Sequence, residues 1–405
     1  MNGDITMRHV VVVGAGQAGF SFVSRLRNLG FDGLITLIGG EPVPPYQRPP
    51  LSKKYLLGEM SLERLYLRPL KFYEEQNINL RLGEDVTAVN ALKKIINIGE
   101  EIISYDELVF TTGSNPRYLP AELGGELDGV YVIRNLSDVD NIVKEFKIDK
   151  HVLIIGGGYI GLEAASVAAK LGLQVTLVEM AERILQRVAS KETSDYFRNL
   201  HKSHGVDIRE KIGVRKLIGS ERVEMIELTD GTNLKVDFVI AGVGITPSTE
   251  LAEMAGCDID NGIKTDALGR TSVNSIWAAG DCSSFPYKAG RIRLESVPNA
   301  IDQSEILAEN IIGGNVEYVA KPWFWSDQFD VKLQIAGLNT GFDDVVTRKT
   351  GSSVSFWYYN GPNLLAVDAM NDPRAYMIGK RLIEAGRSPT KSLIKDTSLD
   401  LKSLL

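Results

Sequence analysis

The feature that most constrains the fold of this chain is a strand–glycine-loop–helix pattern that occurs twice. Residues 10–19 read VVVVGAGQAG and residues 151–161 read HVLIIGGGYIG, so an apolar run opens into G-x-G-x-x-G in both. A helical stretch follows each loop, and a second apolar strand follows each helix, at 34–38 and 174–178. Such glycines permit a tight turn that brings backbone N–H groups and a helix N-terminus to a pyrophosphate. The repeat therefore predicts two dinucleotide-binding βαβ domains.

The two halves resemble each other again further along the chain. Residues 105–116, YDELVFTTGSNP, align with residues 236–247, VDFVIAGVGITP, with Asp, an apolar strand, Gly and Pro at the same offsets. A further strand–Gly–Asp turn at 276–281 follows the second half, which indicates that the second domain is inserted into the first. We predict a first glycine-loop domain at 1–117 and 246–320, an inserted second one at 118–245, and an aromatic-rich α+β domain at 321–405.

Composition narrows the function classes. The 405 residues include 45 Lys and Arg against 52 Asp and Glu, so the net charge of −7 does not provide the basic surface of a general nucleic-acid binder. The two cysteines, Cys257 and Cys282, cannot form a disulfide framework and fit a reducing compartment. No apolar run reaches the roughly 18 residues of a membrane span, and the first residues do not resemble a leader peptide. We expect a cytoplasmic protein.

An acid at the end of the second strand decides which nucleotide a loop prefers. Glu179 holds that place in the second domain, where it would accept hydrogen bonds from a ribose 2′-OH and repel a 2′-phosphate, which favours NADH over NADPH. Arg183 and Arg187 lie nearby and could soften this preference. In the first domain glycines 39–40 stand at the expected place, and either Glu41 takes the role or the backbone replaces it. Two dinucleotides in one chain are most simply a bound flavin and a passing nicotinamide.

Five longer motifs are spread over nearly the whole chain: PYQRPPLSK at 45–53, TGSNPR at 112–117, GDC at 280–282, ESVPNA at 295–300 and PWFWSDQ at 322–328. Together they resemble the motifs of the FAD-dependent ferredoxin reductases of oxygenase systems, whose type members are putidaredoxin reductase and biphenyl dioxygenase ferredoxin reductase. A departure is Gly40, where this family often has an acid.

The resemblance implies a glutathione-reductase-like α/β fold with bound FAD, NADH as electron donor, and a 2Fe-2S ferredoxin as acceptor. That ferredoxin would serve a cytochrome P-450 type monooxygenase or a Rieske-type dioxygenase. The residues implied for FAD are Gly14, Ala15, Gly16, Ala18, Gly19, Glu41, Arg48, Lys53, Val86, Thr112, Gly113, Arg134, Gly280, Asp281, Val297 and Trp325. The residues implied for NAD are Gly156, Gly157, Gly158, Tyr159, Ile160, Gly161, Glu179, Gly242 and Gly244.

Two charged residues are implied in catalysis. Lys53 follows Pro49-Pro50-Leu51-Ser52, which predicts that it lies in the first turn of a helix. By resemblance Lys53 lies beside flavin N5 and O4, where a cation stabilises the electron-rich reduced ring. Glu163 lies near the start of the second glycine-loop helix, and by resemblance it pairs with Lys53. From the residues alone, a solvated lysine and an ordinary helix-start carboxylate remain open. Neither residue needs to transfer a proton, because the step is a hydride transfer.

The spacing of the cysteines excludes an internal redox disulfide. Without a C-x₂-C or C-x₄-C pair, electrons must leave the flavin directly for an external acceptor, and Cys257 and Cys282 are expected to be buried packing residues. Ferredoxins are typically acidic, so a local basic patch is expected for docking. The candidates for this patch are Arg64, Arg68, Lys71, Arg291 and Arg293, although any single one of them is more often a scattered solvated charge. No metal site is expected, and His201 and His204 are interpreted as residues of a surface helix.

Other functions stay open from the sequence. The same enzyme class could use rubredoxin, quinone or oxygen as acceptor, although oxidases of related fold keep a redox cysteine shortly after the first βαβ unit and residues 42–46 contain none. A different class is a regulatory flavoprotein related to apoptosis-inducing factor. The acidic composition and the absence of a targeting segment argue against it.

Overall fold

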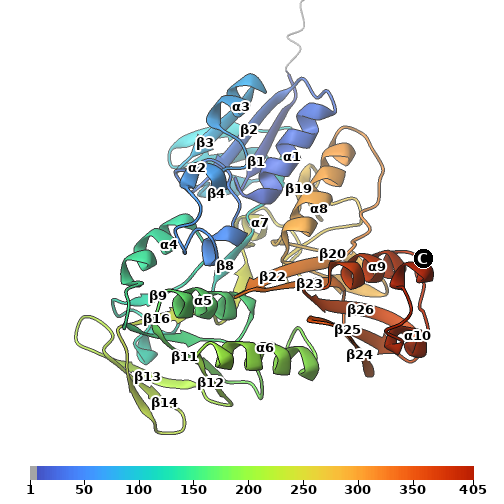
Figure 1. Ribbon diagram of the computed structural model, residues 1–405. Helices are drawn as coiled ribbons and strands as arrows, with labels where there is room; N and C mark the ends of the chain where they lie inside the picture. The colour runs from blue at the N-terminus through green and yellow to red at the C-terminus, as the bar shows by residue number, and fades with distance from the viewer. Residues whose placement is uncertain (1–6) are drawn as a thin grey trace, which may run out of the picture. The chain divides into compact units, whose positions relative to one another are not determined.

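The computed structural model describes residues 7–405, which divide into two compact units, each formed by separate stretches of the chain (Figure 1). Unit 1 comprises the described residues up to Gln47, with Leu62–Asn115 and Ile245–Pro322. Unit 2 comprises Arg48–Ser61, Pro116–Gly244 and Trp323–Leu405. The finer division into three domains stays a prediction.

The main sheet of unit 1 is parallel, in the strand order β19-β7-β1-β2-β3. Val10 and Val12 point into one core and Val11 and Val13 into the other, which explains why the strand sequence is apolar without alternation. The helices α1 and α8 pack side by side over the first of these cores (Figure 1). The bounds are β1 His9–Val13, β2 Leu34–Gly39, β3 Ile78–Leu82, β7 Glu107–Phe110, β19 Ile276–Ala278, α1 Gln17–Asn28 and α8 Val297–Ile311.

Smaller elements complete unit 1. They form two three-stranded sheets, β4-β5-β6 and β18-β20-β21, and three short helices. The strand bounds are β4 Ala88–Asn90, β5 Ile95–Ile98, β6 Glu101–Ser104, β18 Ile263–Lys264, β20 Ser283–Tyr287 and β21 Gly290–Ile292. The helices are α2 Leu62–Leu65, α3 Leu70–Glu75 and α7 Glu250–Met254. Short strands β8 Ser114–Pro116 and β17 Ile245–Pro247 lie where the chain passes between the units.

Unit 2 contains a second parallel sheet of the same construction, in the order β12-β11-β10-β16-β9. Its antiparallel sheet β13-β14-β15 follows β12, just as β4-β5-β6 follows β3 in unit 1, which confirms the internal repeat. The strand bounds are β9 Val130–Tyr131, β10 His151–Ile155, β11 Gln174–Glu179, β12 Asp207–Glu210, β13 Val214–Ile218, β14 Met225–Leu228, β15 Asn233–Lys235 and β16 Phe238–Ala241. The helices are η1 Pro49–Ser52, η2 Ala121–Leu123, α4 Leu136–Ile142, η3 Val143–Glu145, α5 Tyr159–Lys170 and α6 Lys191–Ser203.

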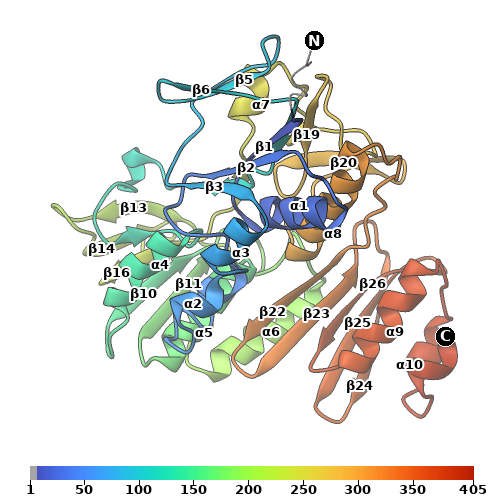
Figure 2. The same ribbon diagram turned by 90° about the horizontal axis from the view of Figure 1, so that it is seen from above.

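The C-terminal part of unit 2 is an antiparallel sheet in the order β22-β23-β26-β25-β24, with α9 lying along it (Figure 2). Trp357, Tyr359 and Val367 of the sheet pack against Tyr376 and Leu382 of α9, so the predicted aromatic-rich segment forms a core between sheet and helix. The bounds are β22 Trp323–Gln328, β23 Val331–Gly337, β24 Asp344–Thr350, β25 Ser353–Asn360, β26 Asn363–Met370, α9 Pro373–Glu384, α10 Lys391–Lys395 and η4 Leu401–Leu404.

The repeat extends to the hydrogen bonds that close each βαβ unit. In unit 1 the backbone N–H of His9 donates to Asp106 Oδ2 at 2.6 Å, and His9 Nε2 lies 2.9 Å from Thr36 Oγ1. Unit 2 has the same two contacts, at 2.8 and 2.9 Å. The residues there are His151, Asp237 and Thr176. The matched Asp residues were part of the predicted repeat, and the matched His and Thr pairs were not.

Candidate functional site

The first glycine loop connects β1 to α1 by a turn that only glycine can make at two positions. Gly14 has φ +115°, and a Cβ built on it would lie 2.2 Å from the carbonyl oxygen of Thr111. A Cβ on Gly19 would lie 2.1 Å from the carbonyl oxygen of Gly14, so α1 packs directly against the loop. Both clashes are with backbone, which cannot move aside cheaply.

The same loop leaves room for an anion at the N-terminus of α1. Gly16 is the N-cap and has no side-chain capping bond, and a Cβ on it would meet no atom within 4 Å. The first turn of α1 carries no acidic residue. Because its first N–H groups and the positive end of the helix dipole face open space, the loop fits a dinucleotide pyrophosphate.

The second glycine loop reproduces this geometry between β10 and α5. Gly156 has φ +106°, and its Cβ would lie 2.3 Å from the carbonyl oxygen of Gly242. A Cβ on Gly161 would lie 2.1 Å from the carbonyl oxygen of Gly156. Gly158 caps α5 without a side-chain bond, and a Cβ on it would meet nothing within 4 Å. Both loops are therefore preformed cradles of the same design.

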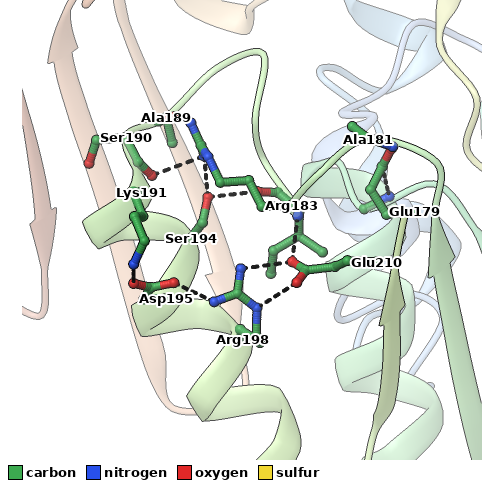
Figure 3. Close-up of polar contacts among 12 residues, drawn as sticks. Glu179, Ala181, Arg183, Ala189, Ser190, Lys191, Ser194, Asp195, Arg198 and Glu210 are labelled. Atoms are coloured by element: carbon green, nitrogen blue, oxygen red, sulfur yellow. Dashed lines mark hydrogen bonds and ion pairs between the residues drawn. The ribbon is translucent and has the colours of Figure 1, made fainter. Parts of the chain in front are cut away.

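Glu179 lies against the second loop. Its Oε2 accepts a hydrogen bond of 2.7 Å from the backbone N–H of Gly157, and its Oε1 accepts one of 2.7 Å from Ala181 (Figure 3). These bonds hold the carboxylate at the end of β11 beside the cradle. An acid in that place fits an unphosphorylated ribose.

Arg183 is held within its own domain. Its guanidinium donates to the carbonyl oxygens of Ala189 and Ser190, at 2.9 and 3.1 Å, and to Ser194 Oγ at 2.5 Å (Figure 3). The suggestion that Arg183 softens the preference for NADH gains no support, because these acceptors already occupy the side chain. Arg187, the other suggested residue, is exposed.

Five more of the residues assigned to FAD lie in unit 1. Gly280 has φ +83°, a Cβ on it would lie 2.9 Å from Ala18 Cβ, and its N–H donates to Gln303 Oε1 at 2.8 Å. This fixes Asp281 near the N-terminus of α1, and Ser114 Oγ donates to Asp281 Oδ2 at 3.3 Å. The others are Thr112, whose hydroxyl donates to the Ser248 carbonyl at 2.7 Å, Gly113 at φ +69°, and Val297 at the start of α8.

Glu41 has a partner of its own. The hydroxyl of Tyr46 donates to Glu41 Oε2 at 2.7 Å, and Tyr46 is buried. The place of an acid at the end of β2 is taken by Gly39 and Gly40. The role of Glu41 toward a ribose stays a prediction.

Unit 2 contains a buried ion pair between Lys53 and Glu163. Lys53 Nζ lies 2.8 Å from Glu163 Oε2, and Glu163 is 3% exposed. The hydroxyl of Ser52 donates to the same carboxylate at 2.6 Å, and that of Ser326 donates to its other oxygen at 2.6 Å. The carboxylate thus has three donors: Ser52 in η1, Lys53 directly after η1, and Ser326 in β22. A buried charge is stabilised by such a set of partners.

The sequence predicted that Lys53 and Glu163 pair, but not the local structure at Lys53 or the two serines that also bind Glu163. Lys53 does not lie in the first turn of a helix, because Pro49–Ser52 forms a single 3₁₀ turn and Lys53 follows it. Proline and serine start that turn, but it is too short to include the lysine. Ser52 and Ser326 were not assigned at all, although both lie within the quoted motifs PPLSK and WFWSDQ. Nothing local in the sequence links position 326 to position 163.

Two other residues assigned to FAD meet within unit 2. Arg48 Nη1 donates to the carbonyl oxygen of Arg134 at 2.8 Å, just before the capping box that starts α4. Trp325 is half-buried on β22, with its ring centroid 5.6 Å from that of Trp323. The adjacent Phe324 packs on Tyr159 of the second glycine loop, at 5.0 Å between centroids.

The two cysteines are buried in unit 1, as expected. Cys282 is fully buried, Cys257 is 7% exposed, and burial raises the pKa of both thiols. Neither has the depressed pKa of a reactive thiol. Within residues 7–405, His, Cys, Asp and Glu side chains do not gather in threes as a metal site would require.

His201 and His204 lie at the C-terminal end of α6, which has exposed side chains as a surface helix does, but His201 itself points inward. His201 is fully buried, with Nε2 2.8 Å from Gln328 Oε1, and desolvation lowers its pKa to about 4. His204 is exposed and stacks on Phe329 at 3.8 Å between centroids. Helix α6 therefore turns one face toward β22, which a histidine spacing of three residues does not reveal.

The basic candidates separate into two groups. Arg291 donates to the carbonyl oxygen of Thr265 at 2.7 Å and also to that of Ser284. Arg293 forms an ion pair with Glu295 at 2.5 Å. Both side chains serve the fold of unit 1 and are unsuited to a docking patch. The remaining three candidates lie exposed on or beside α2 and α3, and they are Arg64, Arg68 and Lys71. No helix in the described part of the chain has both the length and the apolar composition of a transmembrane segment.

Comparisons with known proteins agree with this geometry. A family model described as pyridine nucleotide-disulphide oxidoreductase matches residues 8–304, and one described as reductase C-terminal matches residues 323–405. A ferredoxin–NAD(P)(+) reductase of Sphingomonas sp is 41% identical over 93% of this chain and 92% of its own length. Putidaredoxin reductase of Pseudomonas putida is 38% identical, covering 98% of this chain and 96% of the relative.

A solved structure extends the match to three dimensions. The covalent complex of putidaredoxin reductase with putidaredoxin matches with a TM-score of 0.95 and 38% identity, covering 98% of both chains. The matches span both glycine loops and the C-terminal sheet. The chain therefore belongs to the pyridine nucleotide-disulphide oxidoreductase family and, within it, to the ferredoxin reductases, as its motifs indicated.

Proposed function

We propose that this protein is an NADH-dependent ferredoxin reductase that holds FAD in the first glycine loop and takes NADH in the second. The proposal rests mainly on the two preformed glycine loops. Each ends at a helix N-terminus without a side-chain cap, and a Cβ built on the N-cap glycine, Gly16 or Gly158, would meet no atom within 4 Å. The relatives support the acceptor, because they include reductases of ferredoxins. The ferredoxin would in turn supply a cytochrome P-450 type monooxygenase or a Rieske-type dioxygenase.

The cofactor and the chain divide the work. The chemistry that FAD supplies when bound is acceptance of a hydride from NADH and release of its two electrons, one at a time, to a 2Fe-2S ferredoxin. In unit 1 the N-terminus of α1 would hold the pyrophosphate of FAD, and Asp281 would accept a hydrogen bond from a ribityl hydroxyl. In unit 2 Glu179 would hold NADH by its ribose. Because burial raises the pKa of both thiols, neither is suited to carry electrons, and the electrons would pass from FAD directly to the external acceptor.

Lys53 and Glu163 are the residues that we propose act on the flavin ring. Ser52 and Ser326 hold the Glu163 carboxylate, and the carboxylate in turn fixes the ammonium group of Lys53. The side chain of Lys53 is 14% exposed. A fixed cation stabilises negative charge that develops on a reduced ring without any proton transfer. Lys53→Met is expected to slow flavin reduction by NADH in anaerobic stopped-flow measurements, while the exposed control Lys54→Met keeps the rate. An unchanged rate in Lys53→Met would disprove this role.

The docking surface proposed for ferredoxin is the exposed group Arg64, Arg68 and Lys71 on unit 1. Ferredoxins are acidic as a class, and opposite charge steers a transient partner even when the whole protein is negative. A cytoplasmic location belongs to the same proposal, since NADH is available there and two free cysteines suit a reducing compartment.

The experiment that tests the function is reduction of cytochrome c by NADH with and without ferredoxins from the same genome. We expect rapid reduction only when FAD-loaded protein, NADH and a cognate ferredoxin are all present. Rubredoxin, a quinone and oxygen serve as competing acceptors in parallel assays, and a higher kcat/KM with one of them would replace ferredoxin as the acceptor. A salt-sensitive affinity for DNA, with no reductase activity, would favour the regulatory class instead.

A further inference from the structure

The end of β2 in unit 1 lacks the carboxylate that its counterpart in unit 2 provides. β11 ends in Glu179, whereas β2 ends in Gly39 and is followed by Gly40. A Cβ on Gly39 would lie 2.6 Å from Ala15 Cβ, so this strand end directly adjoins the first glycine loop. An acid at this edge is what usually binds the ribose of a dinucleotide.

A carboxylate from another segment occupies the place. A Cβ built on Gly40 would lie 2.3 Å from Oδ1 of Asp85 and 3.3 Å from its Cγ. The Asp85 carboxylate therefore stands where a side chain at position 40 would begin. Asp85 comes from the connection between β3 and β4, and sequence reasoning did not consider it because it is 45 residues beyond Gly40 (85 − 40).

The backbone fixes this juxtaposition. The N–H of Gly83 donates to the Glu41 carbonyl at 3.0 Å, and the N–H of Glu84 donates to the Gly39 carbonyl at 3.1 Å. These bonds continue the parallel pairing of β2 with β3, in which Gly39 is opposite Leu82. The residue after Glu84 is thereby held beside the end of β2.

The neighbouring acids are engaged and Asp85 is not. Glu41 accepts from the hydroxyl of Tyr46, and Glu84 pairs with Arg81. Within residues 7–405 the Asp85 side chain is exposed and forms neither a hydrogen bond nor an ion pair. A carboxylate with all its acceptor positions open can bind both hydroxyls of a ribose.

We propose that Asp85 is the carboxylate that binds the adenosine ribose of FAD, in place of an acid on β2. The inference rests on the proposed function, because it assumes FAD in the first loop. It assigns to a third residue the role that was left open between Glu41 and the backbone. Gly40 is then explained as the residue that makes room for the Asp85 carboxylate.

Three variants perturb the Asp85 carboxylate in different ways. Asp85→Ala removes it, and Asp85→Asn keeps its shape without the charge. Gly40→Ala leaves Asp85 in place but puts a methyl group within 2.3 Å of its Oδ1, which must move. All three are expected to weaken FAD binding, by about tenfold for Asp85→Ala, the size of one lost charge-assisted pair of hydrogen bonds.

A rescue variant moves the acid back to the strand. In Asp85→Ala the atoms nearest a Cβ at position 40 are gone, because the three closest contacts, out to 3.8 Å, all belong to Asp85. Gly40→Asp combined with Asp85→Ala is therefore expected to restore most of the affinity. Gly40→Asp alone is expected to weaken binding, since two carboxylates would share one place.

The measurement is the Kd of FAD for apo-protein, followed by quenching of flavin fluorescence, with melting temperatures to confirm folding. The exposed control Glu100→Ala should bind FAD within twofold of the wild type. Asp85→Ala with wild-type affinity would overturn the assignment. Failure of the wild type to bind FAD would instead refute the proposed function, so the two failures are distinguishable.

Discussion

The buried ion pair of unit 2 allows a quantitative prediction. The perturbation is Lys53→Met, which removes the ammonium group 2.8 Å from a carboxylate that is 3% exposed. At an effective dielectric constant of about 20, the attraction between two charges at that distance is about 6 kcal/mol before desolvation is subtracted. Loss of one partner of a buried pair typically costs about 3–5 kcal/mol. Ser52 and Ser326 still donate to Glu163, so we expect about 3 kcal/mol.

A double-mutant cycle separates the pair from the bulk of the side chains. Glu163→Gln keeps the shape of the carboxylate and removes its charge, so Lys53→Met should cost much less in that background. We expect a coupling energy of about 2 kcal/mol, within the range found for contacting residues. The assay is urea unfolding of the FAD-loaded protein, followed by circular dichroism, with the exposed Lys54→Met as control. Additivity of the two single variants within about 0.5 kcal/mol would refute the idea that their charges stabilise each other.

Three further predictions test other parts of the structure. Burial lowers the pKa of His201 to about 4. Below pH 6.5 this histidine therefore binds a proton in the unfolded chain but not in the folded chain. The contribution of His201 to the free energy of unfolding is complete above pH 6.5 and is lost as the pH falls toward 4. The free energy of unfolding should drop by about 2 kcal/mol more between pH 7 and 5 in the wild type than in His201→Gln, measured by urea titration, and equal drops would contradict the burial effect. Glu179→Gln should narrow the ratio of kcat/KM for NADH over NADPH, whereas an unchanged ratio would show that the ribose is bound elsewhere. Gly161→Ala should abolish NADH binding because its Cβ would lie 2.1 Å from a backbone oxygen, while Gly158→Ala, with nothing within 4 Å, should fold normally; normal NADH titration of Gly161→Ala would contradict the loop geometry.

Local patterns carried most of the fold. Gly14 and Gly156 were predictable because a glycine with positive φ after an apolar strand is a purely local requirement. The equivalence of two later strands was also predictable, since Asp106 and Asp237 mark them in two copies of one unit. Both copies then close with the same bond from this Asp to the first strand.

Apart from the Lys53–Glu163 pair, which the resemblance implied, contacts between distant segments could not be predicted. Ser326 reaches Glu163 across 163 residues, and the Asp85 carboxylate fills the space of Gly40 only because β2 and β3 pair in one particular register. The burial of His201 depends likewise on how α6 packs on β22, where Gln328 Oε1 forms a hydrogen bond with the ring nitrogen Nε2 of His201. Single-residue signals such as charge or spacing contain no information on such packing.

The central claim is that one chain holds FAD in its first loop and reduces it with NADH for a one-electron acceptor. The most direct measurement is anaerobic mixing of purified protein with NADH, followed by its visible flavin absorbance. The account predicts one FAD per chain, bleached by NADH and far more slowly by NADPH, with colour restored when oxidised ferredoxin is added. A purified protein that takes up no FAD, or a bleached flavin that no ferredoxin can reoxidise, would contradict it.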